Sequence, residues 1–284
     1  MLLALARALA PLPLAGLHLL GAAMGWVVYW ASPTYRRRLQ ENLRLSGVCP
    51  DEDSLRRTRR VVAAELGKAV MELPVVWMRP APAVDRMIAC DDWPVMEAAR
   101  ARGKGILIIT PHLGCFEAVL VYTAQRFPIT ALYRPPHARS LEPLMVAGRA
   151  RGLATVAPAS VAGVRQLLKT LKRGDVVGML PDQAPQAGEG TWVPFFGRPA
   201  YTMTLARRLH EATGAAVVYT YARRLPGGTG YRVYFRAAPD EPFTEAAMNR
   251  AVEGMIRECP EQYLWSYNRY KVPAGVEPPM RNEE

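Results

Sequence analysis

The chain begins with an apolar segment, residues 8–31, in which His18 is the only polar side chain. About 20 apolar residues are enough for a helix to cross the hydrocarbon core of a bilayer. An aromatic cluster ends the segment, and three consecutive arginines, Arg36 to Arg38, follow it. Because cytoplasmic flanks carry the excess of basic residues, we predict that residues 1–31 anchor the chain in a membrane, with its body on the cytoplasmic side.

Two other assignments of this segment remain open. A cleaved signal peptide has a shorter apolar region and a more basic start than Arg7 alone provides, so the sequence fits it poorly. A helix buried in the core, or one lying at the membrane interface, would also be apolar. Pro11 and Pro13 would break a helix near its start.

The chain is strongly basic, with 36 lysines and arginines against 25 aspartates and glutamates in 284 residues, a net charge of +11. All but five of the basic residues are arginines. Arginine binds phosphates and carboxylates with two parallel hydrogen bonds, so the excess indicates anionic partners such as lipid headgroups, an acidic carrier protein or nucleic acid. Because the charge is dispersed and no nucleic-acid-binding motif accompanies it, we expect no nucleic-acid partner.

The four cysteines form no CxxC pair, and no histidine cluster lies beside them in the sequence. A disulfide framework and a zinc site are therefore unsupported, and the pattern suits a reducing compartment. We expect neither a metal nor a cofactor.

Short apolar runs alternate with helical stretches after residue 104. The runs at 105–110, 129–135 and 175–182 are bounded by turn residues, and helical patterns lie between them. Two later runs, 214–224 and 230–238, also resemble strands. Strands alternating with helices predict an α/β fold with a mostly parallel central sheet flanked by helices. The predicted organisation is a membrane anchor at 1–31, a helical membrane-proximal region at 32–104, an α/β core at 105–272 and a tail at 273–284.

His112 and Glu117 follow the first of these strands, in the stretch TPHLGCFE. Five residues along a helix rotate the side chains some 140° apart, so the two meet only if a turn precedes the helix. A carboxylate beside an imidazole would make His112 a general base. The alternatives are a surface histidine with a glutamate favoured by the helix dipole, and a nucleophilic Cys115, which the lack of a glycine-rich elbow disfavours.

Polar residues also close the next two strands. Arg134 follows the second strand and is placed to bind an anion, while Asp182 and Gln183 follow the third. Because ligands gather at the carboxyl ends of parallel strands, we expect these groups to converge on one crevice with His112. The aromatic and proline-rich stretch 188–200 is predicted to be a loop that lines an apolar groove.

These motifs, taken in order, resemble the lipid A biosynthesis acyltransferases of the lauroyl and myristoyl type, which belong to the wider HX4D/E glycerolipid acyltransferases. The resemblance covers nearly the whole chain and rests on the apolar N-terminal helix and the blocks PHLGCFE, YRP, LPDQ, VPFFGRPAYT and PEQYLWSYNRYK. It implies a glycerolipid acyltransferase-like fold in the bacterial inner membrane. It also implies that acyl carrier protein donates an acyl chain to a hydroxyl of a hydroxyacyl chain on a lipid A precursor of the Kdo2-lipid IVA type.

The resemblance also implies roles for the matching residues. His112 would be the general base and Glu117 its orienting carboxylate. Arg134 would bind a phosphate or the developing oxyanion, and Asp182, next to Gln183, would orient Arg134 or the acceptor.

Departures from the family pattern leave the acceptor open. Cys115 and Phe116 stand where the family often has Asn and Trp, and Tyr267 and Asn268 stand where it commonly has His and Arg. The FPEGTRS motif of the lysophosphatidate branch is absent, which disfavours glycerol-phosphate acceptors. The alternatives are the same chemistry on another glycolipid, aminolipid or lysophospholipid, and a membrane-tethered basic binding protein without catalysis.

Overall fold

A computed structural model describes residues 2–136 and 138–279. The helices are α1 (Leu2–Leu9), α2 (Leu14–Ala31), α3 (Pro33–Leu45), α4 (Glu52–Met71), α5 (Leu73–Met78), α6 (Ala81–Asp85), α7 (Trp93–Ala101), α8 (Phe116–Ala124), α9 (Glu142–Arg149), α10 (Val161–Lys172), α11 (Leu205–Thr213) and α12 (Glu245–Glu258), with short 3-10 turns at η1 (Arg139–Leu141), η2 (Pro226–Gly228) and η3 (Pro260–Gln262). The strands are β1 (Ile88–Ala89), β2 (Ile106–Ile109), β3 (Ile129–Tyr133), β4 (Ala154–Pro158), β5 (Val176–Met179), β6 (Gly190–Phe195), β7 (Arg198–Met203), β8 (Ala216–Arg224) and β9 (Tyr231–Ala237).

The central sheet has the strand order β1-β9-β8-β2-β5-β3-β4. The pairs β8–β2, β2–β5, β5–β3 and β3–β4 are parallel, and β8–β9 is antiparallel. This confirms the predicted mostly parallel α/β sheet. The central strands β2 and β5 are buried along their whole length, as strands covered by helices on both faces must be.

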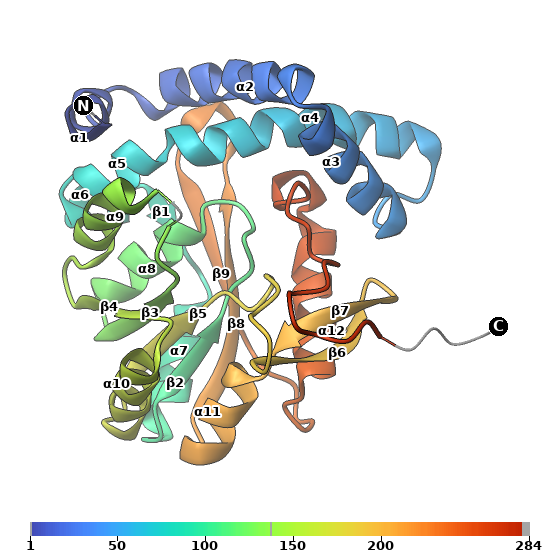
Figure 1. The fold of residues 1–284 in the computed structure, drawn as a ribbon. Coiled ribbons are helices and arrows are strands. Elements are labelled where there is room, and N and C mark those ends of the chain that lie inside the picture. Colours follow the sequence, from blue (N-terminus) through green and yellow to red (C-terminus); the bar gives the residue numbers. More distant parts are fainter. Residues whose placement is uncertain (1, 137, 280–284) are drawn as a thin grey trace.

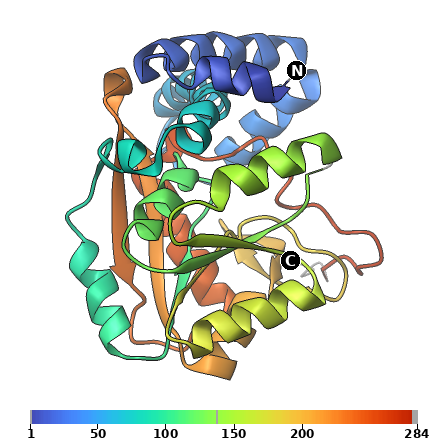
Figure 2. The ribbon, with the colours of Figure 1, turned by 90° about the vertical axis from the view of Figure 1, so that its left-hand side faces the viewer.

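Helices cover both faces of the central sheet (Figures 1 and 2). Side chains of β2 alternate between two hydrophobic cores, one on each face. Ile106 and Ile108 pack with α7 and α8, whereas Leu107 and Ile109 pack with α10, α11 and α12. This period of two explains why an uninterrupted apolar run can serve both layers.

A layer formed by the N-terminal helices lies across one end of the sheet, at the top of Figure 1. The last residue of β8, Arg224, binds Glu65 of α4 and Glu72 just beyond it, so this end is the carboxyl edge of the parallel strands. Ser32 and Asp51 cap the starts of α3 and α4, because their side chains accept hydrogen bonds from Tyr35 N and Ser54 N.

The apolar N-terminal segment forms two helices, α1 and α2, with a break around Pro11 and Pro13. In the described part of the chain α2 is the one helix whose length and composition would allow it to cross a membrane. A third of its residues are buried in the protein.

The stretch predicted as a loop at 188–200 is a β-hairpin, β6–β7, separate from the main sheet. Its strands pair Pro194 with Pro199 and turn at Phe196, which has a positive φ of 48°, and Gly197. A two-stranded ribbon tolerates proline because its outer edges need no hydrogen bonds. Because of its prolines, the sequence of this stretch predicts a loop and not two strands.

Candidate active site

The loop that carries His112 lies between β2 and α8 and is held by backbone hydrogen bonds to two other segments. Gly114 N donates to Gln262 O at 3.0 Å, and Cys115 N donates to Ala222 O at 2.9 Å. Gly114 has φ +60°, and a Cβ there would lie 1.9 Å from Ala222 O, so glycine is required. The turn before the helix therefore exists as the sequence predicted, and it fixes the His112 backbone at the carboxyl edge of the sheet.

Asp182 holds His112 through two contacts. His112 N donates to Asp182 Oδ2 at 2.9 Å, and His112 Nδ1 lies 2.8 Å from Asp182 Oδ1. Because a carboxylate accepts, the Nδ1 proton points at Asp182 and Nε2 is left as the basic nitrogen. Burial alone would raise the pKa of Asp182, but the neighbouring His112 and, further off, Arg269 outweigh it and lower the pKa. Asp182 is therefore ionised and can stabilise an imidazolium.

The second ring nitrogen of His112, Nε2, is not bound to Asp182 and belongs to a partly exposed side chain. The His112 side chain is 20% exposed, whereas that of Asp182 is buried. Gln183 Nε2 lies 3.3 Å from His112 Nε2, and the Phe116 ring packs edge-on against the imidazole at 5.0 Å between centroids. One polar group and one aromatic ring thus border the basic nitrogen.

Glu117 is not the residue that contacts the imidazole. Within the described part of the chain its carboxylate binds Arg149, the last residue of α9, with Arg149 Nε 2.9 Å from Oε1 and 3.1 Å from Oε2. Glu117 is buried, and Arg149 is nearly so. The expected His112–Glu117 contact is therefore replaced by two separate pairs, His112–Asp182 and Glu117–Arg149, and Arg149 is a site residue that the sequence analysis missed.

The strand order explains this rearrangement. β5 lies next to β2 in the sheet, so Asp182 comes beside His112, although 70 residues separate them. β3 lies one strand further away, and Arg134 after it is 51% exposed and 3.8 Å from Glu189. The structure therefore brings together His112, Asp182 and Gln183, and it leaves Arg134 at the rim.

Two further buried groups lie behind Asp182, both from the block PEQYLWSYNRYK. Arg269 donates to Tyr201 O at 2.7 Å and to Thr202 Oγ1 at 2.6 Å, and burial lowers its pKa. Burial, followed by the charge of Asp182, raises the pKa of Tyr263. Within the described residues the hydrogen-bond acceptors of Arg269 are neutral, which is uncommon for a buried arginine. Its positive charge adds to that of a protonated His112 in favouring the Asp182 anion.

An apolar pocket of about 40 Å³ lies beside the Glu117–Arg149 pair, between α8 and strands β2, β3 and β5. Phe116 connects it to the imidazole, and Gly178 of β5 leaves part of its wall without a side chain. The remaining walls are almost all aliphatic. Such a pocket suits a hydrocarbon group next to the basic nitrogen.

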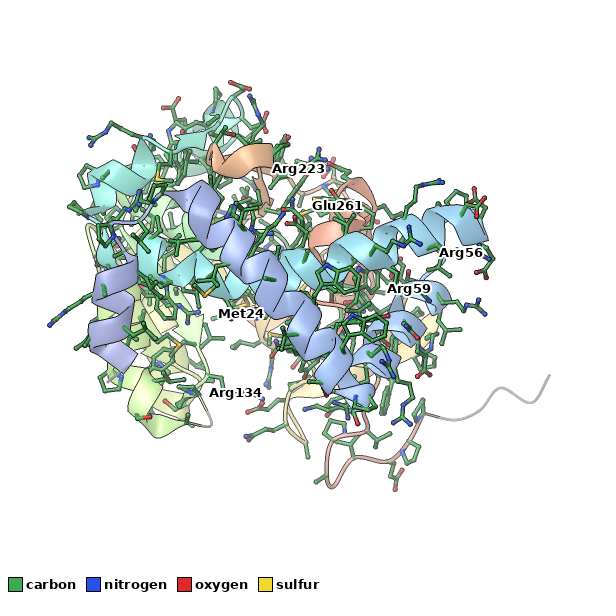
Figure 3. All side chains as sticks on the ribbon, turned by 90° about the horizontal axis from the view of Figure 1, so that it is seen from above. Met24, Arg56, Arg59, Arg134, Arg223 and Glu261 are labelled. Atoms are coloured by element: carbon green, nitrogen blue, oxygen red, sulfur yellow. The ribbon has the colours of Figure 1, made fainter. Side chains whose placement is uncertain are left out.

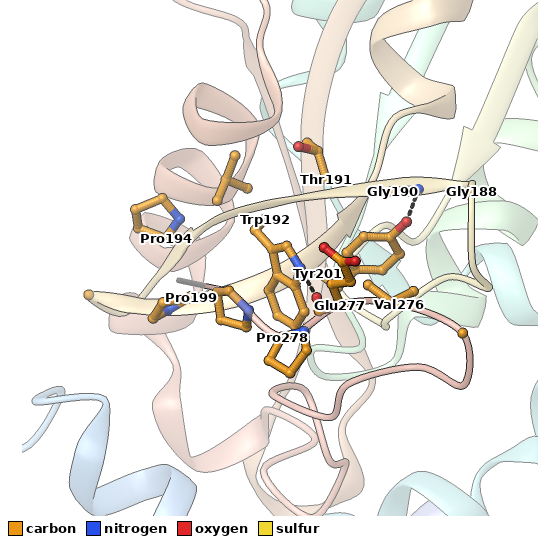
Figure 4. A pocket seen from close by; sticks show the side chains of 14 residues that line it. Gly188, Gly190, Thr191, Trp192, Pro194, Pro199, Tyr201, Val276, Glu277 and Pro278 are labelled. Carbon is orange, nitrogen blue, oxygen red and sulfur yellow. Dashed lines mark hydrogen bonds between the residues drawn. The ribbon is translucent and has the colours of Figure 1, made fainter. Parts of the chain in front are cut away.

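A larger cavity of about 1200 Å³ lies between the β6–β7 hairpin and the chain after Gly275 (Figure 4). Trp192 Nε1 donates to Glu277 O at 2.9 Å across it, and Gly190 N donates to the Tyr201 hydroxyl at 3.2 Å. The expected apolar groove at this stretch is therefore present. The described residues that line it include no histidine.

Within residues 2–136 and 138–279, no cluster of three or more histidine, cysteine, aspartate or glutamate side chains is placed to hold a metal ion. Cys115 is buried, and burial, followed by the charge of Glu72, raises its pKa, so it is a poor nucleophile.

The fold and site define an α/β protein with an imidazole–carboxylate pair at the carboxyl edge of a parallel sheet. Such a pair is suited to taking a proton from a hydroxyl.

Comparison with known proteins assigns the chain to a family. The family model for bacterial lipid A biosynthesis acyltransferases matches residues 1–272, so the chain belongs to that family and is an acyltransferase. It is 28% identical over 276 residues to the lipid A biosynthesis lauroyltransferase of Escherichia coli K12, covering 93% of this chain and 89% of the relative. It is 27% identical over 277 residues to the lipid A biosynthesis palmitoleoyltransferase of the same organism, covering 93% and 88% of the two chains. The resemblance inferred from the motifs is confirmed.

Proposed function

We propose that this chain transfers a fatty acyl group from acyl carrier protein to a hydroxyl of a hydroxyacyl chain on a lipid A precursor. The observation that carries the proposal is the His112–Asp182 pair, which leaves Nε2 as the basic nitrogen, in contact with the neutral Gln183 amide and near an apolar pocket. Membership of the lipid A acyltransferase family supports the acceptor class. The excess of arginine suits both a phosphorylated glycolipid and an acidic carrier protein.

In the proposed reaction His112 Nε2 accepts the proton of the acceptor hydroxyl while its oxygen attacks the thioester carbonyl. An ester bond forms, the carbon–sulfur bond breaks, and the imidazolium returns the proton to the departing thiolate. Asp182 takes the orienting role that the sequence assigned to Glu117, because it is the carboxylate bound to Nδ1. The acceptor hydroxyl would displace the Gln183 amide from Nε2.

The Glu117–Arg149 pair lines the proposed acyl pocket, and the bound carboxylate keeps the arginine side chain against the wall. Arg134, half exposed at the rim, is available to bind a phosphate of the acceptor. We place the enzyme at the bacterial inner membrane, with its site on the cytoplasmic side, where acyl carrier protein and the precursor would meet.

The test is an in vitro assay with a panel of acyl carrier proteins of different chain length and a tetra-acylated lipid A precursor, with products identified by mass spectrometry. Wild type should form a penta-acylated product, and His112→Ala should lose it while keeping its melting temperature. His210→Ala on α11, whose Nδ1 lies 2.9 Å from Ala215 O, is the matched control and should remain active.

The outcomes separate the alternatives. Transfer to a different glycolipid or aminolipid, but not to the precursor, would keep the chemistry and reject the acceptor. Full activity of His112→Ala would reject the base. No transfer to any acceptor would favour a binding protein without catalysis.

A further inference from the structure

Helix α2 has an outward face without a single polar side chain. Its buried positions, Leu14, Leu17, His18, Gly21, Gly25 and Tyr29, follow a helical stripe toward the protein. The exposed face carries large apolar residues, of which Leu19 is 75% exposed, Val27 67% and Trp30 66%. The outer face of a surface helix in a water-soluble protein is normally polar. Leu3, Leu5 and Leu12 extend the apolar surface onto α1 and the break after it.

The inward face of α2 is in backbone contact with α4. A Cβ on Gly25 would lie 2.0 Å from Ala63 O, and a Cβ on Gly67 would lie 1.9 Å from Gly21 O. The two helices therefore touch where only glycine fits, and α2 cannot rotate or slide without breaking this contact. Figure 3, seen from above, shows α2 lying across the top of the molecule over α4, with Met24 along it.

A buried charge network ties both helices to the catalytic sheet. His18 Nε2 of α2 lies 3.4 Å from Glu72 Oε2, and both Glu72 oxygens accept from Arg224 at 2.8 Å. Arg224 also donates to Glu65 of α4 at 2.8 Å. Moving α2 away would expose these buried charges and remove the His18–Glu72 contact. We therefore treat α2, α4 and β8 as one rigid unit.

This unit cannot cross a bilayer through α2. Because α4 lies antiparallel along α2, a spanning α2 would carry Glu65 and Lys68 of α4 to the middle of the hydrocarbon core, beside Gly21 and Gly25. Ionised side chains are strongly disfavoured at that depth. The α2 helix fits a membrane only when it lies parallel to the membrane plane, with its apolar face toward the hydrocarbon and α4 on the water side.

We propose that α1 and α2 dock the protein in the plane of an anionic lipid surface, as a monotopic anchor and not as a transmembrane helix. Charge complementarity supports a lipid occupant, since the exposed Arg37, Arg38, Arg56, Arg57 and Arg60 lie on α3 and α4 beside the apolar face. Figure 3 shows Arg56 and Arg59 at one side of α2, and the Arg36 guanidinium lies 5.5 Å from the Trp30 ring centroid. Arginines that flank an apolar helix face are typical of interfacial membrane binding.

The proposal replaces the expectation that residues 1–31 span the bilayer. It depends on the proposed function at one point only, which is the choice of a lipid bilayer as the binding partner of the α2 face. The carboxyl edge of the sheet, with His112, lies on the side of the molecule that α2 and α4 cover (Figure 1). In-plane docking would therefore turn the carboxyl edge of the sheet toward the membrane.

The first experiment measures the depth of α2 in vesicles of phosphatidylcholine and phosphatidylglycerol that hold the full-length chain. Leu20→Cys and Val27→Cys, each in a Cys49→Ser, Cys90→Ser background, carry a fluorophore quenched by spin-labelled lipids at known depths. The two positions are seven residues apart, about 10 Å along a helix axis. In-plane docking predicts equal, shallow depths. A depth difference near 10 Å would overturn the proposal in favour of a spanning helix.

The second experiment compares two valines of similar exposure, since Val27 is 67% and Val161 is 71% exposed. Val27→Glu should weaken vesicle binding at least about tenfold, because a carboxylate would enter the hydrocarbon. Val161→Glu on α10, in the lower part of Figure 1, should bind like wild type. Equal binding of both variants, or no binding of wild type, would reject the docking surface. Neither experiment uses acyl donor or acceptor, so a failure here is distinct from a failure of the proposed reaction.

Discussion

Asp182 contacts His112 at both its backbone nitrogen and its ring nitrogen, at 2.9 Å and 2.8 Å. The first contact fixes the loop, and the second fixes the tautomer. A single carboxylate, three residues after the neighbouring strand β5, thus holds both the loop and the ring of the proposed base. The glutamate of the PHLGCFE block serves a different partner, Arg149.

Removing the imidazole should remove the proton acceptor and little else. General base catalysis contributes about 10²–10⁴-fold in rate, so His112→Ala should lower kcat by roughly that factor. The side chain is partly exposed, and the loop keeps its backbone bonds to Gln262 and Ala222. Steady-state rates with one acyl donor check the first expectation, and thermal unfolding checks the second. A kcat within threefold of wild type would contradict the assignment.

The Glu117–Arg149 pair should matter for folding stability. Glu117→Gln leaves a mostly buried guanidinium without its carboxylate, which should cost about 3 kcal/mol in the free energy of unfolding. Glu241→Gln removes the exposed partner of Arg250, 3.1 Å away, and should cost less than about 1 kcal/mol. Urea unfolding of both variants measures the difference. Equal free energies of unfolding in both variants would show that the Glu117–Arg149 pair contributes little to stability.

The apolar pocket should respond to the size of residue 178. An added Cβ at Gly178 would meet Ile129 Cδ1 at 3.5 Å, an ordinary contact, so alanine fits and valine fills more of the space. We expect Gly178→Ala and then Gly178→Val to shift the products stepwise toward shorter acyl chains. Competition assays with mixed acyl donors give the chain-length profile. A profile unchanged in both variants would place the acyl chain elsewhere.

Acid should destabilise the layer formed by the N-terminal helices through Glu72. Burial raises the pKa of this carboxyl, but Arg224 and His18 outweigh burial and hold the pKa at about 2, below the ordinary value of 4.5. A carboxyl with a depressed pKa stabilises the fold above its unfolded pKa and loses that contribution as the pH falls. Stability should therefore decline between about pH 4.5 and pH 2.

The matched variant is Glu72→Gln, which should be less stable than wild type by about 3–5 kcal/mol at neutral pH because it leaves Arg224 short of a buried partner. Its stability should also fall less steeply below pH 4.5. Chemical unfolding at several pH values measures both effects. A parallel decline in wild type and variant would assign the acid sensitivity to other groups.

Much of the fold followed from local patterns. The apolar runs at 105–110, 129–135 and 175–182 correspond to β2, β3 and β5. β4 was missed, because Ala154–Pro158 is a short strand at the sheet edge that contains small residues and a proline. The prolines of the β6–β7 hairpin likewise predict a loop, although the segment forms two strands.

The site was harder to predict, because the order of the strands in the sheet decides which side chains meet. Sequence spacing placed Glu117 nearest to His112, but β5 lies beside β2 and brings Asp182 there instead. Arg149 had no local signal, since it ends an ordinary helix 32 residues after its partner. The proposed in-plane placement of α2 likewise depends on a contact with Gly67, far along the chain.

The central claim is that Asp182, and not Glu117, activates His112. Its most direct test is kcat for acyl transfer by Asp182→Asn and Glu117→Gln, measured side by side below the melting temperature of each variant. Asparagine can still accept the His112 backbone bond, so the loop should hold while the charge is lost. We predict a loss on the order of 10²–10⁴-fold for Asp182→Asn and less than about tenfold for Glu117→Gln. The reverse order would contradict the account.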